Sequence, residues 1–322
     1  MPVETIGSPV LWGGFIAFVL AMLTIDLGVF HKNAHEVSLR EAGIWSAVWV
    51  ALAVAFNAGV YAWFGAERAL EFTAGYLIEK ALAVDNIFVF VVIFSTFAVP
   101  ALHQHRVLFW GVLGALIMRA GFILAGGALL QRFHWAIYVF GALLAITGVR
   151  LLVQRDQEIH PENNPLVRWF KELLPMTPEF HGGKFTVVEQ GRRYGTPLLL
   201  ALVAVEFTDL IFAVDSIPAI FAVTSDPFIV FTSNIFAILG LRSLYFLLAG
   251  VITKFVYLKV GLSFVLIFVG AKMLLMDVYK VPIVFSLGVI AGILVMSIVV
   301  SLLRPPRPGS RLVAESSSST QA

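Results

Sequence analysis

The sequence reads Glu79-Lys-Ala-Leu-Ala-Val-Asp85-Asn86-Ile87 within one long apolar run and Asp209-Leu-Ile-Phe-Ala-Val-Asp215-Ser216-Ile217 within another. Each stretch carries two acids six residues apart, the tripeptide Ala-Val-Asp, and then a small polar residue followed by Ile. An acid at the centre of a membrane helix costs about 2.5–3.5 kcal/mol. Such acids must therefore pair with other charges, line a wet cavity or hold a cation.

The composition shows that these runs belong to a membrane protein. Hydrophobic residues make up 59% of the 322 residues and charged residues only 13%, against about 25% charged in soluble domains. This balance excludes an ordinary soluble enzyme, a nucleic-acid-binding protein and a disordered protein. The net charge of +2 gives no reason to expect a polyanionic partner. The chain has no Cys, which excludes disulfides, thiolate metal sites and thiol redox chemistry.

Nine apolar runs are long enough to cross a bilayer, which takes roughly 20 helical residues. They are continuously apolar and lack the alternation of a membrane barrel. The sequence therefore predicts an all-α, polytopic transmembrane helix bundle with spans at residues 9–30, 42–64, 70–99, 106–129, 134–153, 197–222, 228–250, 257–277 and 282–303.

The basic residues of the loops predict the orientation. On the side of the N-terminus the loops carry Arg68, Arg132 and Lys280, whereas most other loop Lys and Arg residues fall on the opposite side. The positive-inside rule then places the N-terminus outside and the C-terminus in the cytoplasm.

Prolines and changes in composition divide the chain. Residues 154–195 carry four prolines and mixed charges, and the tail is low in complexity. The predicted parts are two N-terminal helices (1–65), a first three-helix repeat (66–153), a cytoplasmic linker loop (154–195), a second three-helix repeat (196–277), a last transmembrane helix (278–303) and a disordered cytoplasmic tail (304–322).

The two acidic stretches each begin a triplet of spans, spans 3–5 and 6–8. The next span of each triplet carries one arginine, Arg119 or Arg242, and the third carries Gly148-Val-Arg150 or Gly270-Ala-Lys272. Three landmarks in register indicate a real repeat. Because three is an odd number of spans, the second copy enters the bilayer from the other side, as in the inverted repeats of secondary transporters.

The membrane acids outnumber the membrane arginines. We expect Arg119 and Arg242 to act as structural ion-pair partners, because guanidinium groups stay charged and bind carboxylates well. The remaining negative charge favours a cation site, for which the candidate ligands are Asp85, Asp215, Asn86, Ser216, Glu79, Asp209 and Glu206. Oxygen ligands of this kind suit Mg²⁺, Ca²⁺ and Mn²⁺, and a bare oxygen site equally binds Na⁺ or relays protons.

Helix geometry limits which acids share that site. Residues six apart do not lie on one face of an ideal helix, so we expect Asp85 and Asp215 to face the common site and their partners Glu79 and Asp209 to face an arginine. Pro218 is expected to kink or break the sixth span beside Asp215. Such a break either frees carbonyl groups for a cation or only serves packing.

At these residues the sequence resembles the TerC family of integral membrane proteins, named for tellurium resistance, and most closely its Alx-type bacterial members. The resemblance rests on residues 75–86, 206–223 and 226–242 and extends over roughly 7–303. It implies a protein of the bacterial inner membrane linked to manganese homeostasis, with export of Mn²⁺ as its role. The family's acidic membrane motifs correspond here to Glu79, Asp85, Asn86, Glu206, Asp209 and Asp215.

We therefore expect a transporter that exports a hard divalent cation, Mn²⁺ by resemblance, through alternating access. No catalytic triad, nucleotide-binding loop or metal-hydrolase motif is present in the sequence, so we expect no enzyme activity and no prosthetic group. The expected partners are the transported ion and the lipid bilayer, without nucleic acid.

Two alternatives stay open. One is a proton- or sodium-coupled exporter of another substrate. The other is a membrane-bound accessory or redox modulator protein linked to tellurite resistance, whose charges are structural. The lack of Cys and of a haem or flavin motif speaks against the redox version.

Overall fold

The structure is a computed structural model that describes residues 5–30, 37–133, 135–153, 175–189, 191–249, 257–279 and 281–303. The first five helices are α1 (Pro9–Phe30), α2 (Leu39–Phe64), α3 (Ala66–Thr96), α4 (Ala101–Arg132) and α5 (Ala136–Val153). A hairpin of β1 (Thr186–Glu189) and β2 (Arg192–Gly195) precedes α7 (Pro197–Phe221), α8 (Pro227–Leu239), α9 (Leu241–Leu248), α10 (Leu258–Leu274) and α11 (Ile283–Leu303).

Local sequence signals fix several helix boundaries. Pro197 and Pro227 stand at the first positions of α7 and α8, where the missing N–H costs nothing. Asp226 caps α8 by accepting a hydrogen bond from the backbone N–H of Phe228 at 2.9 Å. Gly65, with φ of 87°, separates α2 from α3 in a conformation that favours glycine.

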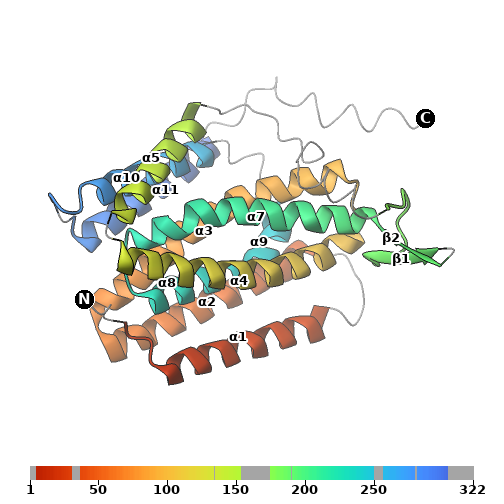
Figure 1. Cartoon of the computed structure of the whole chain (residues 1–322), viewed down its shortest axis with the longest axis horizontal. Coiled ribbons are helices and arrows are strands. Elements are labelled where there is room, and N and C mark those ends of the chain that lie inside the picture. The colour runs from red at the N-terminus through yellow and green to blue at the C-terminus, as the bar shows by residue number, and fades with distance from the viewer. Residues whose placement is uncertain are drawn as a thin grey trace.

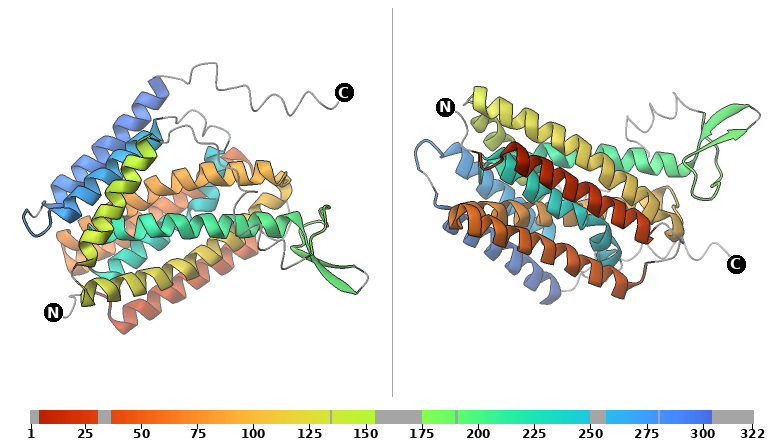
Figure 2. Two further views of the ribbon diagram at one scale, coloured as in Figure 1. Left: turned by 45° about the horizontal axis from the view of Figure 1, so that its top comes forward. Right: turned by 90° about the horizontal axis from the view of Figure 1, so that it is seen from below.

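Helices α3, α4, α7 and α8 form the centre of the molecule. Both α3 and α4 pack against α7 and α8, and α3, α4 and α7 run lengthwise side by side (Figure 1). Helices α5, α10 and α11 form a second group that crosses the first obliquely, with α5 packed along α10 (Figure 2). The β1–β2 hairpin projects from one end.

Helices α3 and α7 lie antiparallel, so the two acidic stretches pass each other at the centre. Residues 83–94 of α3 share a hydrophobic core with residues 198–205 of α7. At the other end, a Cβ on Gly75 would lie 3.1 Å from Cγ2 of Ile220. Beyond it, Glu71 accepts a hydrogen bond from the hydroxyl of Thr224 at 2.8 Å.

Glycines bring the backbones of α5 and α10 into direct contact. A Cβ on Gly148 would lie 2.8 Å from the carbonyl oxygen of Ser263, and a Cβ on Gly270 would lie 2.6 Å from the carbonyl oxygen of Gly141. Real Cβ atoms do not approach backbone this closely. Close contact of small residues is a common way for membrane helices to associate.

Several helices have the length and composition of membrane spans. Among the described residues, four qualify: Ala101–Leu130, Ala136–Val153, Pro197–Phe221 and Ile283–Leu303. Helices α8 and α9 add a fifth if they form one broken span. The prediction of a helical protein with several membrane-length apolar helices is confirmed at this level. The count of nine spans and the inverted repeat stay predictions.

Pro218 does not break its helix, and the alternative expectation of a kink at this residue stays a prediction. Helix α7 continues through Pro218 to Phe221. Since Pro218 lies in the last turn of α7, it removes a single helical hydrogen bond and little helix follows it. A break is found instead within the next predicted span, residues 228–250, where α8 and α9 differ in direction by 40° on either side of Gly240.

The linker and tail are described only in part. Residues 154–174 and 304–322 lie outside the described residues. Residues 175–195, expected to be a loop, contain the β1–β2 hairpin, in which Thr186 pairs with Gly195 and Glu189 with Arg192. The stretch Thr-Val-Val-Glu has the β-branched residues that favour a strand, but it is too short to stand out in the sequence.

Candidate functional site

Arg119 on α4 is the centre of a buried polar cluster. Its Nε and Nη2 donate to the two carboxylate oxygens of Asp209 on α7, at 3.1 and 2.9 Å. Its Nη1 donates to Glu79 on α3 and to the hydroxyl of Ser216 on α7, the latter at 3.2 Å. All four residues are almost fully buried. One guanidinium therefore joins three helices and is shared by two carboxylates.

Asp85 lies on another face of α3 and points toward α10. Its Oδ1 lies 3.8 Å from Nζ of Lys259, and the Asp85 side chain is 15% exposed. The Lys259 ammonium also lies 3.9 Å from the centre of the Phe88 ring, one turn further along α3. Asp85 thus has a cationic partner that is one-third exposed and at the long end of ion-pair distance.

Asp215 points toward α5. The hydroxyl of Thr147 donates to Oδ1 of Asp215 at 3.2 Å, and the Asp215 side chain is only partly buried. The structure gives Asp215 no ion pair among the described residues. The two Ala-Val-Asp aspartates therefore face α10 and α5, while Glu79 and Asp209 face Arg119. Helices α5 and α10 are neighbours, so Asp85 and Asp215 are both directed at the same pair of helices.

The remaining candidate residues lie around these positions. Glu206, one turn before Asp209, packs its carboxylate against α4, where a Cβ on Gly114 would lie 2.0 Å from its Oε1. Asn86 is buried, and its Oδ1 has no hydrogen-bond partner among the described residues. Arg242 on α9 lines a small cavity together with Trp45, Trp49 and His105, among others.

The seven candidate ligands are thus divided among separate places. Glu79, Asp209 and Ser216 contact Arg119, whereas Asp85 and Asp215 do not. Over the residues that the structure describes, no three His, Asp or Glu side chains lie close enough together to hold a metal ion. A single coordination sphere of all seven residues is not present in this conformation.

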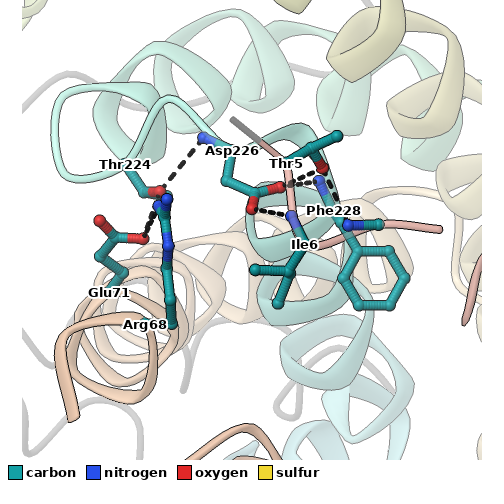
Figure 3. Close-up of polar contacts among 8 residues, drawn as sticks. Thr5, Ile6, Arg68, Glu71, Thr224, Asp226 and Phe228 are labelled. Carbon is teal, nitrogen blue, oxygen red and sulfur yellow. Dashed lines mark hydrogen bonds and ion pairs between the residues drawn. The ribbon is translucent and has the colours of Figure 1, made fainter. Parts of the chain in front are cut away.

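Sequence analysis missed a second polar network, at the end of the bundle where α3 begins (Figure 3). Asp226 accepts hydrogen bonds from the hydroxyl of Thr5 at 2.7 Å and from the backbone N–H of Ile6 at 2.8 Å. The hydroxyl of Thr224 donates to Glu71, which also pairs with Arg68 at 3.0 Å. The network ties the N-terminal segment, α3 and the α7–α8 loop together. Its sequence signal was weak, because the partners lie far apart along the chain.

Thr147 and Lys259, the partners of the two aspartates, were also missed. Neither residue belongs to the acidic stretches, and only the packing of α5 and α10 brings them to Asp215 and Asp85.

Comparisons with known proteins identify the family. The integral membrane protein TerC family matches residues 64–308. An uncharacterized membrane protein of Myxococcus xanthus is 62% identical over 300 residues, which cover 93% of this chain and 94% of that protein. A protein of Escherichia coli K12 named "Putative membrane-bound redox modulator Alx" is 50% identical over 308 residues, which cover 92% and 96%. No solved structure matches. The chain belongs to the TerC family of integral membrane proteins.

Proposed function

We propose that this chain is a multi-pass transporter that exports a hard divalent cation, Mn²⁺ first, from the cytoplasm across the bacterial inner membrane. The proposal includes no enzyme activity and no prosthetic group. The observation that carries it is the division of the acids between two faces. Arg119 neutralises much of the charge of Glu79 and Asp209, which leaves Asp85 and Asp215 as partly buried acids directed at α5 and α10.

Asp85 and Asp215 have the properties that a transport site requires. Their partners are a one-third-exposed ammonium and a hydroxyl, and an arriving cation displaces such partners more easily than a bidentate guanidinium. Two carboxylates supply the charge that matches one divalent ion, and oxygen ligands suit Mn²⁺. In this proposal, Asn86, Ser216 and Glu206 join as accessory ligands when the helices move.

The contacts between α5 and α10 support an inverted repeat. If Gly148 corresponds to Gly270, as the landmarks indicate, a shift of 122 residues also relates Gly141 to Ser263. Exchanging each residue for its counterpart in the other repeat turns one observed contact into another. The contact of Gly148 with the Ser263 carbonyl corresponds to the contact of Gly270 with the Gly141 carbonyl, and both are present. The packing of α3 on α8 likewise corresponds to the packing of α7 on α4. A twofold axis in the membrane plane produces this exchange, and such an axis suits alternating access.

The metal content of cells tests this proposal. Deletion of the gene should raise cytoplasmic manganese and sensitivity to added Mn²⁺, and the wild-type chain should reverse both effects. The name of the Alx relatives supports a second candidate, a membrane-bound redox modulator. That role predicts unchanged metal content after deletion and an altered response to oxidants or tellurite.

A further inference from the structure

The span after Asp226 is interrupted at its centre. Helix α8 ends at Leu239, α9 begins at Leu241, and the two directions differ by 40°. The C-terminal end of a helix carries carbonyl groups without helical partners and the negative end of the helix dipole. Within a bilayer, such an end must be satisfied by protein or by an ion.

The ammonium of Lys80, from α3, occupies this end. Its Nζ donates to the carbonyl oxygen of Ala237 at 3.0 Å and lies 5.8 Å from the centre of the Tyr76 ring. Gly240 provides the space, since a Cβ there would lie 2.9 Å from Nζ of Lys80 and 3.2 Å from Cβ of Trp49. In broken transporter helices, the C-terminal end of a half-helix is a place where Na⁺ is coordinated.

Further buried polar atoms on the same two helices lack a hydrogen-bond partner within the described part of the chain. The hydroxyl of Tyr76, one turn before Lys80 on α3, is buried without a hydrogen-bond partner among the described residues. The same holds for both polar atoms of the Asn234 side chain, one turn before Ala237 on α8. Buried polar groups without partners are costly, and carbonyl, amide and hydroxyl oxygens are ligands for alkali cations.

We propose that the α8–α9 break is an alkali-cation site that the chain fills with its own cation, the ammonium of Lys80. The tethered charge satisfies the negative end of α8, so the fold needs no Na⁺ or K⁺ at this place. Removal of the side chain leaves the carbonyl end and a space, and opens the site to a free ion. This inference does not depend on which cation the protein transports.

Thermal unfolding of the purified full-length chain tests the proposal. The midpoint is measured in NaCl, KCl and N-methyl-D-glucamine chloride at equal ionic strength. We expect the wild-type midpoint to be the same in all three salts. Lys80→Ala should unfold at a lower temperature in N-methyl-D-glucamine, and added Na⁺ or K⁺ should raise its midpoint until the effect saturates, as for any ligand that binds the native state.

Three further variants make the result decisive. Lys272→Ala removes another lysine within a helix, away from the break, and should show no alkali dependence. Lys80→Gln keeps a donor without the charge, so a midpoint near that of wild type in every salt would mean that only the hydrogen bond matters and would overturn the proposal. The proposal is also overturned if the unfolding midpoint of Lys80→Ala is the same in all three salts. Failure of Lys80→Ala to accumulate in Na⁺-rich medium, while Lys80→Arg accumulates, also overturns it.

Discussion

The guanidinium of Arg119 holds the carboxylate of Asp209 through two hydrogen bonds, at 3.1 Å from Nε and 2.9 Å from Nη2. The remaining nitrogen of the same group contacts Glu79 on α3. A buried ion pair adds little net stability, but loss of one partner leaves an uncompensated buried charge, which costs about 3–5 kcal/mol. The cluster therefore holds α3, α4 and α7 together chiefly because separating them would leave buried charges without their partners.

Arg119→Ala should sharply reduce the amount of protein in the membrane, since it leaves Glu79 and Asp209 buried without their cation. The measurement is an immunoblot of membrane fractions, with transport normalised to the protein present. Arg132→Ala is the matched control, because Arg132 lies at the exposed end of the same helix. Normal abundance of Arg119→Ala would show that the cluster does not support the fold.

Gly270→Ala should destabilise the protein by about 1–3 kcal/mol, a typical cost of overpacking. The added methyl would meet the backbone of Gly141 and Ala145, at 2.6 and 2.7 Å, and backbone cannot move aside as a side chain can. Gly288→Ala on α11 is the control, because its Cβ meets nothing within 4 Å. Equal unfolding midpoints for the two variants would argue against the close α5–α10 contact.

Asp226→Ala should lower the free energy of unfolding by about 2 kcal/mol. The change removes the cap of α8, worth about 0.5–2 kcal/mol, and the hydrogen bonds from Thr5 and Ile6. Because the N-terminal segment loses its attachment, protease cleavage near residue 5 should also become faster. Thr224→Val breaks only the bond to Glu71 and the bond from the Asp226 N–H. It should leave the N-terminal segment protected, and equal cleavage rates in both variants would contradict this account.

The orientation is tested with reporters. A reporter at the C-terminus should be active in the cytoplasm, and one at residue 1 should be active outside, because the basic loops collect on one side. Both ends on the same side of the membrane would rule out nine spans and the inverted arrangement of the repeat.

Sequence patterns predicted those features that depend on local geometry. The six-residue spacing of Glu79 and Asp85 places them on different faces of any helix, and the structure turns one toward Arg119 and the other toward Lys259. The lengths of the apolar runs predicted long helices, because the number of residues needed to span a bilayer also follows from local helix geometry. Neither result required knowledge of the packing.

Features that depend on packing were not predictable in this way. Glycine is common inside membrane helices, so Gly240 does not by itself indicate in the sequence that the helix breaks there. Pro218 gave a strong local signal for a kink or a break, but it lies in the last turn of α7, and the helix continues through it. The contact of Thr5 with Asp226 joins residues 221 positions apart, and no spacing rule reaches that far.

The most direct test of the account is the accumulation of radioactive Mn²⁺ in inverted membrane vesicles that contain wild-type, Asp85→Asn or Asp215→Asn protein. Asn keeps the size and one oxygen of the aspartate but lacks the charge that offsets dehydration of the ion. Each variant should reach wild-type abundance and lose Mn²⁺ accumulation, while Glu67→Gln, an exposed acid at the start of α3, should transport normally. Wild-type accumulation by both aspartate variants at normal abundance would contradict the account and would make these acids structural.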